Sequence, residues 1–146
     1  MMAIDPQLQD TLSLEQIEDS YWGEPAADAT RLVQTAHQIR RKPIGTLSVE
    51  DLRLLLGQQI GVAVLIPLAL GELERVPLAE GDFYPGDLLA TVLRLPHTYW
   101  QGHSAQRECL ERIVQEVEKI GDLNEHGAPH DVVWEQINDF HRRVQG

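Results

Sequence analysis

Cysteine, aromatic residues and positive charge are all scarce in this sequence. Cys109 is the only cysteine among 146 residues, which excludes an intrachain disulfide and a cysteine-based zinc site. Aromatic residues make up 5% of the chain, and Lys and Arg number 12 against 23 Asp and Glu. The formal charge of −11 argues against direct binding to nucleic acid or to anionic lipid, since both need cationic contacts. It is compatible with a basic protein partner.

Long hydrophobic runs are also missing. The most apolar stretch, residues 60–71, is too short to cross a bilayer and predicts a core helix. Residues 1–10 are polar and acidic, without the positive start and apolar stretch of a signal peptide. We therefore expect a cytoplasmic protein with no membrane partner.

The familiar catalytic motifs are missing too. The chain has no G-x-S-x-G elbow, no P-loop and no H-E-x-x-H. Gly127 and Pro129 lie between His126 and His130, which disfavours a helical metal pair. We expect no metal, no cofactor and no enzyme activity. A small acid/base enzyme using Asp82, Asp87 and His97 is kept as a lesser alternative.

Helical signals dominate what is present. Ser13 with Gln16, and Ser48 with Asp51, have the spacing of helix-capping pairs. Apolar residues recur at helical spacing, and no linker or repeat divides the chain. We predict an all-α, single-domain bundle of about six or seven helices over residues 1–146, with residues 1–25 as a loose acidic arm. After a short helix at Ser13, the predicted helices cover about 27–41, 48–60, 62–75, 87–95, 105–120 and 131–144.

Several local interpretations stay open. Pro67 either kinks its helix or lies in the first turn, and Val62–Ile66 alone has the composition of a buried strand. Gly57 and Gly61, four residues apart, suggest a helix face that packs closely against another helix. We expect Cys109 to be a small buried side chain.

Charge is distributed unevenly along the chain. Residues 1–30 hold seven acidic residues and no Lys or Arg, whereas residues 31–53 are net positive. Residues 72–87 hold five acids against Arg75, and residues 122–139 hold five acids with no Lys or Arg. Each block is either a solvated face or part of an anionic surface that steers a cationic partner.

The most informative stretch is the loop predicted over residues 77–86, where acids surround Phe83 and Tyr84. Aromatic rings beside carboxylates suit a protein interface, because the rings supply contact area and the acids supply specificity. The alternatives are that Phe83 plugs the core under a Tyr84 lid, and that Asp82 caps a helix with Pro85 in its first turn. The predicted partner-binding residues are Glu80, Asp82, Tyr84, Asp87, Trp22 and Glu24.

The middle of the chain resembles the immunity proteins of bacterial contact-dependent growth inhibition systems. The resemblance covers roughly residues 40–100 and depends on the order and spacing of several short segments. These segments are Leu47–Arg53, Gly57–Gly61, Ile66–Leu70, Gly81–Leu89 and Leu95–Pro96.

This resemblance implies a small, helical, cytoplasmic antidote that is not an enzyme. It would bind the toxin domain of a cognate effector, commonly a nuclease, in a 1:1 complex. An anionic inhibitor suits a nuclease, whose substrate site must hold phosphates with cationic groups. The main alternative is a small acidic adaptor or homodimeric regulatory protein that uses the Gly57/Gly61 face.

Overall fold

The chain folds into a stack of helices. The computed structural model describes residues 9–145, and within them lie eight α-helices, two isolated β-bridges and no strand. Six of the helices have seven or more residues, which confirms the expected all-α bundle. The helices are α2 (Leu14–Glu18), α3 (Arg31–Ile39), α4 (Val49–Gly57), α5 (Val62–Arg75), α6 (Asp87–Leu93), α7 (His97–Gln101), α8 (Ser104–Ile120) and α9 (His130–Gln145), with short 3₁₀ helices at Ile44–Thr46 and Leu123–His126.

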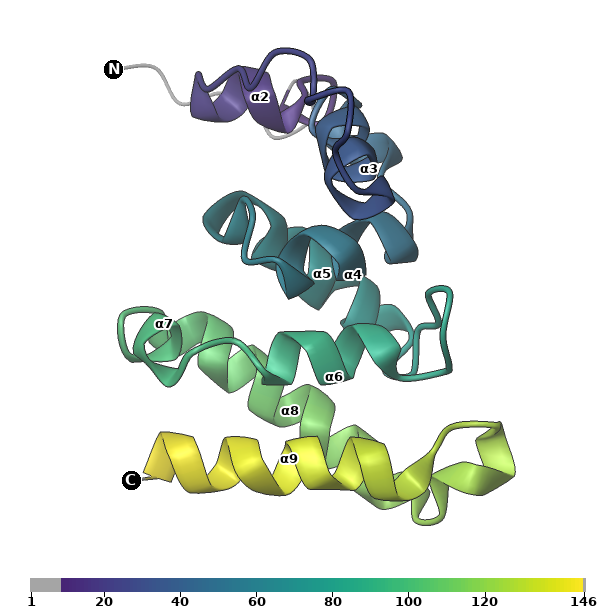
Figure 1. Ribbon diagram of the computed structural model, residues 1–146. Coiled ribbons are helices and arrows are strands. Elements are labelled where there is room, and N and C mark those ends of the chain that lie inside the picture. The colour runs from purple at the N-terminus through teal and green to yellow at the C-terminus, as the bar shows by residue number, and fades with distance from the viewer. Residues whose placement is uncertain (1–8, 146) are drawn as a thin grey trace.

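The helices are arranged along one long direction of the molecule. In Figure 1, α2 and α3 form the upper end, α4 and α5 the middle, and α8 and α9 the lower end, with α6 above α9. The loop from α5 to α6 projects at the right of this view, as does the segment between α8 and α9. The acidic loop singled out in the sequence therefore lies on one side of the stack.

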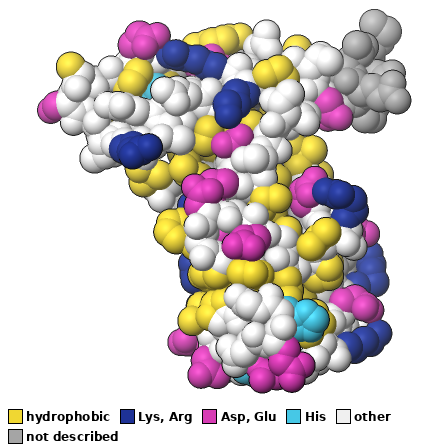
Figure 2. All heavy atoms as spheres, turned by 90° about the vertical axis from the view of Figure 1, so that its right-hand side faces the viewer, with side chains coloured by type: hydrophobic (Ala, Val, Ile, Leu, Met, Phe, Trp, Pro, Cys, Tyr) yellow, Lys and Arg dark blue, Asp and Glu magenta, His cyan; other side chains and the backbone are white. Residues whose placement is uncertain are grey.

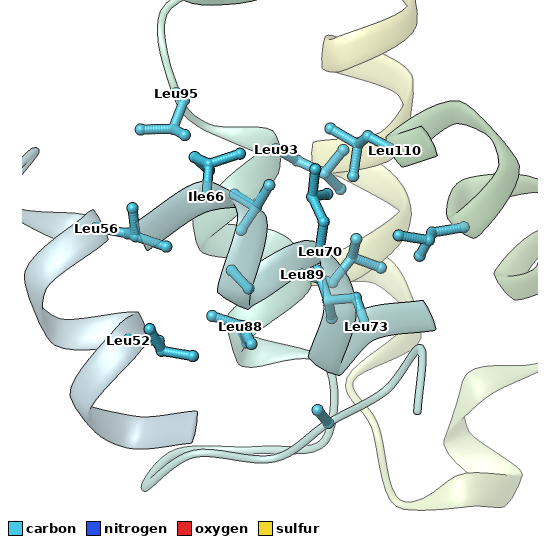
Figure 3. Packing of buried hydrophobic residues seen from close by; sticks show 14 of the residues in the cluster. Leu52, Leu56, Ile66, Leu70, Leu73, Leu88, Leu89, Leu93, Leu95 and Leu110 are labelled. Atoms are coloured by element: carbon cyan, nitrogen blue, oxygen red, sulfur yellow. The ribbon is translucent and has the colours of Figure 1, made fainter. Parts of the chain in front are cut away.

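The core is built around α6, in which all seven residues are buried. This helix packs against α4, α5 and α9. Its leucines meet apolar side chains of α4, α5 and α8, as Figure 3 shows. Each fully buried leucine stabilises the fold by about 1.5–3 kcal/mol relative to an exposed one, so α6 holds the stack together.

The two capping pairs predicted from the sequence are confirmed. The Ser13 side chain accepts the N–H of Gln16 at 3.2 Å, and the Gln16 side chain accepts the N–H of Ser13 at 2.8 Å. Ser48 and Asp51 form the same reciprocal pair at the start of α4, at 3.0 and 3.1 Å. Both capping pairs could be predicted from the sequence because the two residues of each pair lie within one helical turn.

Two helix boundaries in the first half differ from the prediction. α3 begins at Arg31 rather than near residue 27, because Thr30 caps it by accepting the N–H of Val33. α4 ends at Gly57, and Gly61 precedes α5 as its N-cap. The predicted common helix face of Gly57 and Gly61 is therefore wrong, although Gly61 does lie against the buried Leu14.

The open interpretations of the apolar segment are settled. Residues 62–66 begin α5, so the strand alternative is wrong. Pro67 lies inside α5 and not in its first turn. Beyond α6, the short helix α7 was not predicted, and it follows Pro96, which cannot continue a helix.

The acidic arm expected over residues 1–25 lies partly outside the described residues. Its described part is anchored, because Leu14 is fully buried and the N–H of Glu15 donates to the carbonyl of Arg40. Cys109 is half-buried rather than buried, and its thiol donates to Glu74. Between residues 9 and 145, no helix is long and apolar enough to cross a membrane.

Candidate functional site

The loop between α5 and α6 folds back on itself before α6 begins. Glu80 and Pro85 form an isolated antiparallel bridge, and the N–H of Gly86 donates to the carbonyl of Leu78 at 3.1 Å. Gly86 has a φ of 96°, a left-handed conformation that glycine adopts without strain. The chain therefore turns at Gly86, and α6 begins at Asp87. The alternative in which Asp82 caps a helix with Pro85 in its first turn is wrong.

The carboxylate of Asp87 accepts hydrogen bonds from the backbone of this loop. Its side chain is 3% exposed, and its Oδ1 accepts the N–H of Gly81 at 2.7 Å. Its Oδ2 accepts the N–H of Phe83 at 3.1 Å. Hydrogen bonds from backbone N–H groups to a carboxylate are among the stronger ones in proteins. Asp87, which was predicted to bind a partner, is thus buried. Its carboxylate instead binds the backbone of the loop and fixes the shape of the loop.

A second carboxylate, from α4, holds the neighbouring residue. Glu50 Oε1 accepts the N–H of Asp82 at 2.9 Å. The same carboxylate accepts two hydrogen bonds from Arg53, one turn further along α4. These bonds from Arg53 lower the pKa of Glu50, and those to Glu50 raise the pKa of Arg53. Three consecutive N–H groups, at residues 81 to 83, are therefore bound by two carboxylates from different helices.

Gly81 lies at the point where these two carboxylates converge. A Cβ at this position would lie 2.5 Å from Glu50 Oε1 and 2.9 Å from Asp87 Oδ2. Both contacts are closer than real Cβ atoms show, and both carboxylates are fixed by their own hydrogen bonds. A side chain at position 81 would therefore displace one of these carboxylates from its hydrogen bonds.

The loop presents Phe83 to solvent. Its side chain is 67% exposed, so the alternative that Phe83 plugs the core is wrong. The Arg53 guanidinium lies over its ring, 4.4 Å from the centroid, in a cation–π contact. Tyr84 is half-buried and packs against the core. Glu80 and Asp82, which precede Phe83 in the loop, are also exposed.

A second acidic segment lies beside this loop. Gly127 and Val133 border Pro85 and Gly86, since a Cβ on Gly127 would lie 3.9 Å from Pro85 and one on Gly86 would lie 3.3 Å from Val133. Acids remote in the sequence thus reach one side of the molecule, which faces the viewer in Figure 2. We call this surface the acidic face and define it by Glu80, Asp82, Phe83, Asp122, Glu125 and Asp131.

The acidic face holds few opposing charges. No Lys or Arg occurs in residues 76–93 or 120–141. Among residues 9–145, Glu80, Asp82, Glu125 and Asp131 form no ion pair within 4 Å. Below the loop, an open hollow of about 600 Å³ runs along α9. The hollow adjoins the acidic face at Asp131 and also holds a cation, since its lining is His130, Asp131, Trp134, Glu135, Asn138 and Arg142.

The other two predicted binding residues lie elsewhere. Trp22 and Glu24 belong to the segment between α2 and α3, at the upper end of Figure 1. Trp22 is 42% exposed and covers the buried guanidinium of Arg40, 4.1 Å from its ring centroid. Glu24 is 84% exposed and pairs with Arg41 at 3.2 Å. The structure thus brings Glu80, Asp82, Tyr84 and Asp87 together but does not place Trp22 and Glu24 with them.

The residues of the acid/base alternative do not assemble into a site. Asp87 is enclosed by loop N–H groups at the start of α6, whereas His97 lies beyond the end of that helix. Seven helical residues separate the two ends by roughly 10 Å. Among residues 9–145, no three His, Cys, Asp or Glu side chains are grouped in a way that could hold a metal ion.

Glu50, Arg53 and Gly81 were not in the predicted site, and Phe83 was noted as a ring of the loop but not among the predicted binding residues. Glu50 and Arg53 are a full helix away from the loop in sequence, so no local pattern connects them to it. The resemblance did include both the Leu47–Arg53 and Gly81–Leu89 segments, and the structure places these two segments in contact.

Comparison with known proteins gives one match. A family model described as CDI immunity proteins matches residues 16–110, which is more than half of the chain. Neither the curated proteins nor the solved structures contain a match. The matched region begins inside α2 and ends inside α8, so it includes the whole α5–α6 loop and extends the resemblance noted over residues 40–100. The chain therefore belongs to the family of immunity proteins of contact-dependent growth inhibition (CDI) systems.

Proposed function

We propose that this protein binds the toxin domain of a cognate CDI effector in the cytoplasm and neutralises it as a 1:1 complex. We propose further that the toxin is a nuclease and that the acidic face covers its cationic substrate surface. The observation that carries this proposal is the acidic face itself. It joins residues 80–83 and 122–131 on one side of the molecule, and neither segment contains a Lys or Arg.

The physical basis is electrostatic complementarity. A nuclease must hold phosphates with Lys and Arg, so its substrate surface has the sign opposite to this face. Opposite potentials steer two proteins together and can raise the association rate by orders of magnitude at low salt. Glu80, Asp82, Glu125 and Asp131 form no ion pair within 4 Å, and Arg53, which lies over the Phe83 ring, is the nearby cation that acts on Asp82.

Binding kinetics with the purified toxin domain encoded beside this gene test the proposal. We expect the association rate to fall steeply as salt is raised, since exposed charges are screened. The double variant Glu80→Gln/Asp82→Asn should associate severalfold more slowly and show a weaker salt dependence. Glu108→Gln, which removes an exposed acid on α8 outside the acidic face, is the matched control and should behave as wild type.

A second measurement separates binding from protection. Cells producing the wild-type protein should survive delivery of the cognate toxin. The mass of the purified complex in solution should equal that of one immunity protein and one toxin domain. An association rate that is independent of salt and of both substitutions would contradict the electrostatic part of the proposal. Cells that make the protein and still die would contradict the immunity function itself.

A further inference from the structure

We infer that Phe83 is the anchor of the toxin complex and inserts into an apolar recess of the toxin that is rimmed by Lys or Arg. This inference rests on the proposed function and adds the residue that holds the complex together. It also describes the chemistry of the partner's surface at that point.

Exposure singles out Phe83 first. Seven large hydrophobic side chains are exposed in the described part of the chain, and Phe83 at 67% is the most exposed of them. A large aromatic ring left in water gains about as much on binding as it would in a core. Few residues dominate most protein interfaces, and they are typically buried aromatic anchors near the centre. Phe83 follows the exposed acids Glu80 and Asp82 in the chain and precedes Pro85, which lies beside Gly127 of the 122–131 segment.

Rigidity is the second observation. The N–H groups of Gly81, Asp82 and Phe83 are all bound by carboxylates, at 2.7, 2.9 and 3.1 Å. These carboxylates belong to α4 and to the fully buried α6, so the loop is attached to the core. A loop already fixed in its bound shape loses little conformational entropy on association. The exposed Phe83 ring therefore belongs to a loop whose backbone is fixed by hydrogen bonds to the core helices.

Arg53 sets the orientation of the ring. Its guanidinium lies 4.4 Å from the Phe83 ring centroid, and Glu50 fixes it through two hydrogen bonds. One face of the ring is thus occupied, which leaves the ring edge and the other face for a partner. Because the exposed acids Glu80 and Asp82 belong to the same loop as the ring, the matching recess is apolar inside with Lys or Arg at its rim. Glu50 and Arg53 act here as positioning residues.

Dissociation kinetics with the same toxin domain test the anchor. Phe83→Ala should raise the dissociation rate by about tenfold or more, the size of effect expected for an interface hot spot. Its association rate and salt dependence should stay close to wild type, because no charge is removed. Leu32→Ala, which truncates another exposed apolar residue on α3, is the matched control and should leave both rates unchanged. Thermal unfolding of each variant confirms that the fold is intact.

A double-mutant cycle tests the positioning residues. Glu50→Gln should raise the dissociation rate when Phe83 is present and add little when Phe83 is already Ala. A merely structural role for Glu50 would give the same increase in both backgrounds and would overturn the positioning role.

The two proposals fail in different ways. An unchanged dissociation rate for Phe83→Ala, with a salt-dependent association rate, would overturn the anchor and leave the proposed function standing. No binding of the wild-type protein to its toxin domain would overturn both.

Discussion

Two acid-rich regions of this protein use their charge differently. In the segment before α3, Glu15 and Glu18 surround the buried Arg40, and Glu24 pairs with Arg41. On the acidic face, Glu80, Asp82, Glu125 and Asp131 are exposed and form no ion pair within residues 9–145. The acids of the first region thus form ion pairs with Arg40 and Arg41. The acids of the acidic face leave that surface with a net negative charge. Net charge along a sequence does not distinguish the two uses, whereas the location of the cations does.

The largest expected effect lies at the end of α3, where Arg40 meets the carboxylates of α2. Arg40→Ala should lower the free energy of unfolding by about 3 kcal/mol, because it removes a buried cation from between two carboxylates and from beneath Trp22. Urea unfolding measures this loss. Arg75→Ala, which breaks the exposed pair with Glu72, is the control and should cost less than about 0.5 kcal/mol. Equal losses would mean that Arg40 contributes no more than a surface charge.

A smaller effect is expected where the two carboxylates meet under the α5–α6 loop. Gly81→Ala should destabilise the protein by about 1–2 kcal/mol, since the new methyl group displaces Glu50 or Asp87 from its hydrogen bonds. Thermal or urea unfolding provides the value. Gly71→Ala on α5 has open space around the added atom and should stabilise by up to about 1 kcal/mol through helix propensity. A neutral Gly81→Ala would show that the carboxylates can move freely.

Acid pH should weaken the hydrogen bonds that the Glu50 carboxylate makes to Arg53 and to the loop. The folded-state pKa of Glu50 lies below its ordinary value of 4.5, chiefly because Arg53 donates to the carboxylate. Its contribution is therefore present above pH 4.5 and is lost as the pH falls through the lower folded-state value. Stability measured between pH 7 and 3 should decline less steeply at the acid end in Glu50→Gln than in wild type. In Glu108→Gln the acid-side decline should match wild type.

The smallest effect on stability is expected on the acidic face. Glu80→Gln and Asp82→Asn should each change the free energy of unfolding by less than about 0.5 kcal/mol, because Asp82 joins the loop network through its backbone N–H. Their toxin association should nevertheless slow. A large loss of stability in either variant would remove the contrast between the two acid-rich regions.

The parts of this structure that were predictable from sequence are those whose causes are local. Both capping pairs act within a single turn, and the apolar spacing located α5, α8 and α9 to within a residue or two. The predicted continuous helix face of Gly57 and Gly61 failed because the chain leaves α4 at Gly57 and enters α5 after Gly61. Apolar spacing alone does not show such a short interruption.

The candidate site was only half predictable, for a related reason. The acids and aromatic rings of the loop are adjacent in sequence and were identified as a group. The support of the loop comes from Glu50, which binds the N–H of Asp82 across 32 positions. Asp87 looked like a surface acid, and only the folded chain shows it buried beneath Gly81 and Phe83. Exposure of Phe83 likewise depends on this support and not on its neighbours in sequence.

The atoms that Glu50 and Asp87 hold are main-chain N–H groups, which every amino acid except proline possesses. The hydrogen bonds at positions 82 and 83 can therefore form with any side chain except proline. Under the proposed function, substitutions there would change the side chains offered to a toxin while these backbone hydrogen bonds remain. Positions 82 and 83 would thus be free to change in response to an altered toxin, because the hydrogen bonds that Glu50 and Asp87 accept from the loop would remain.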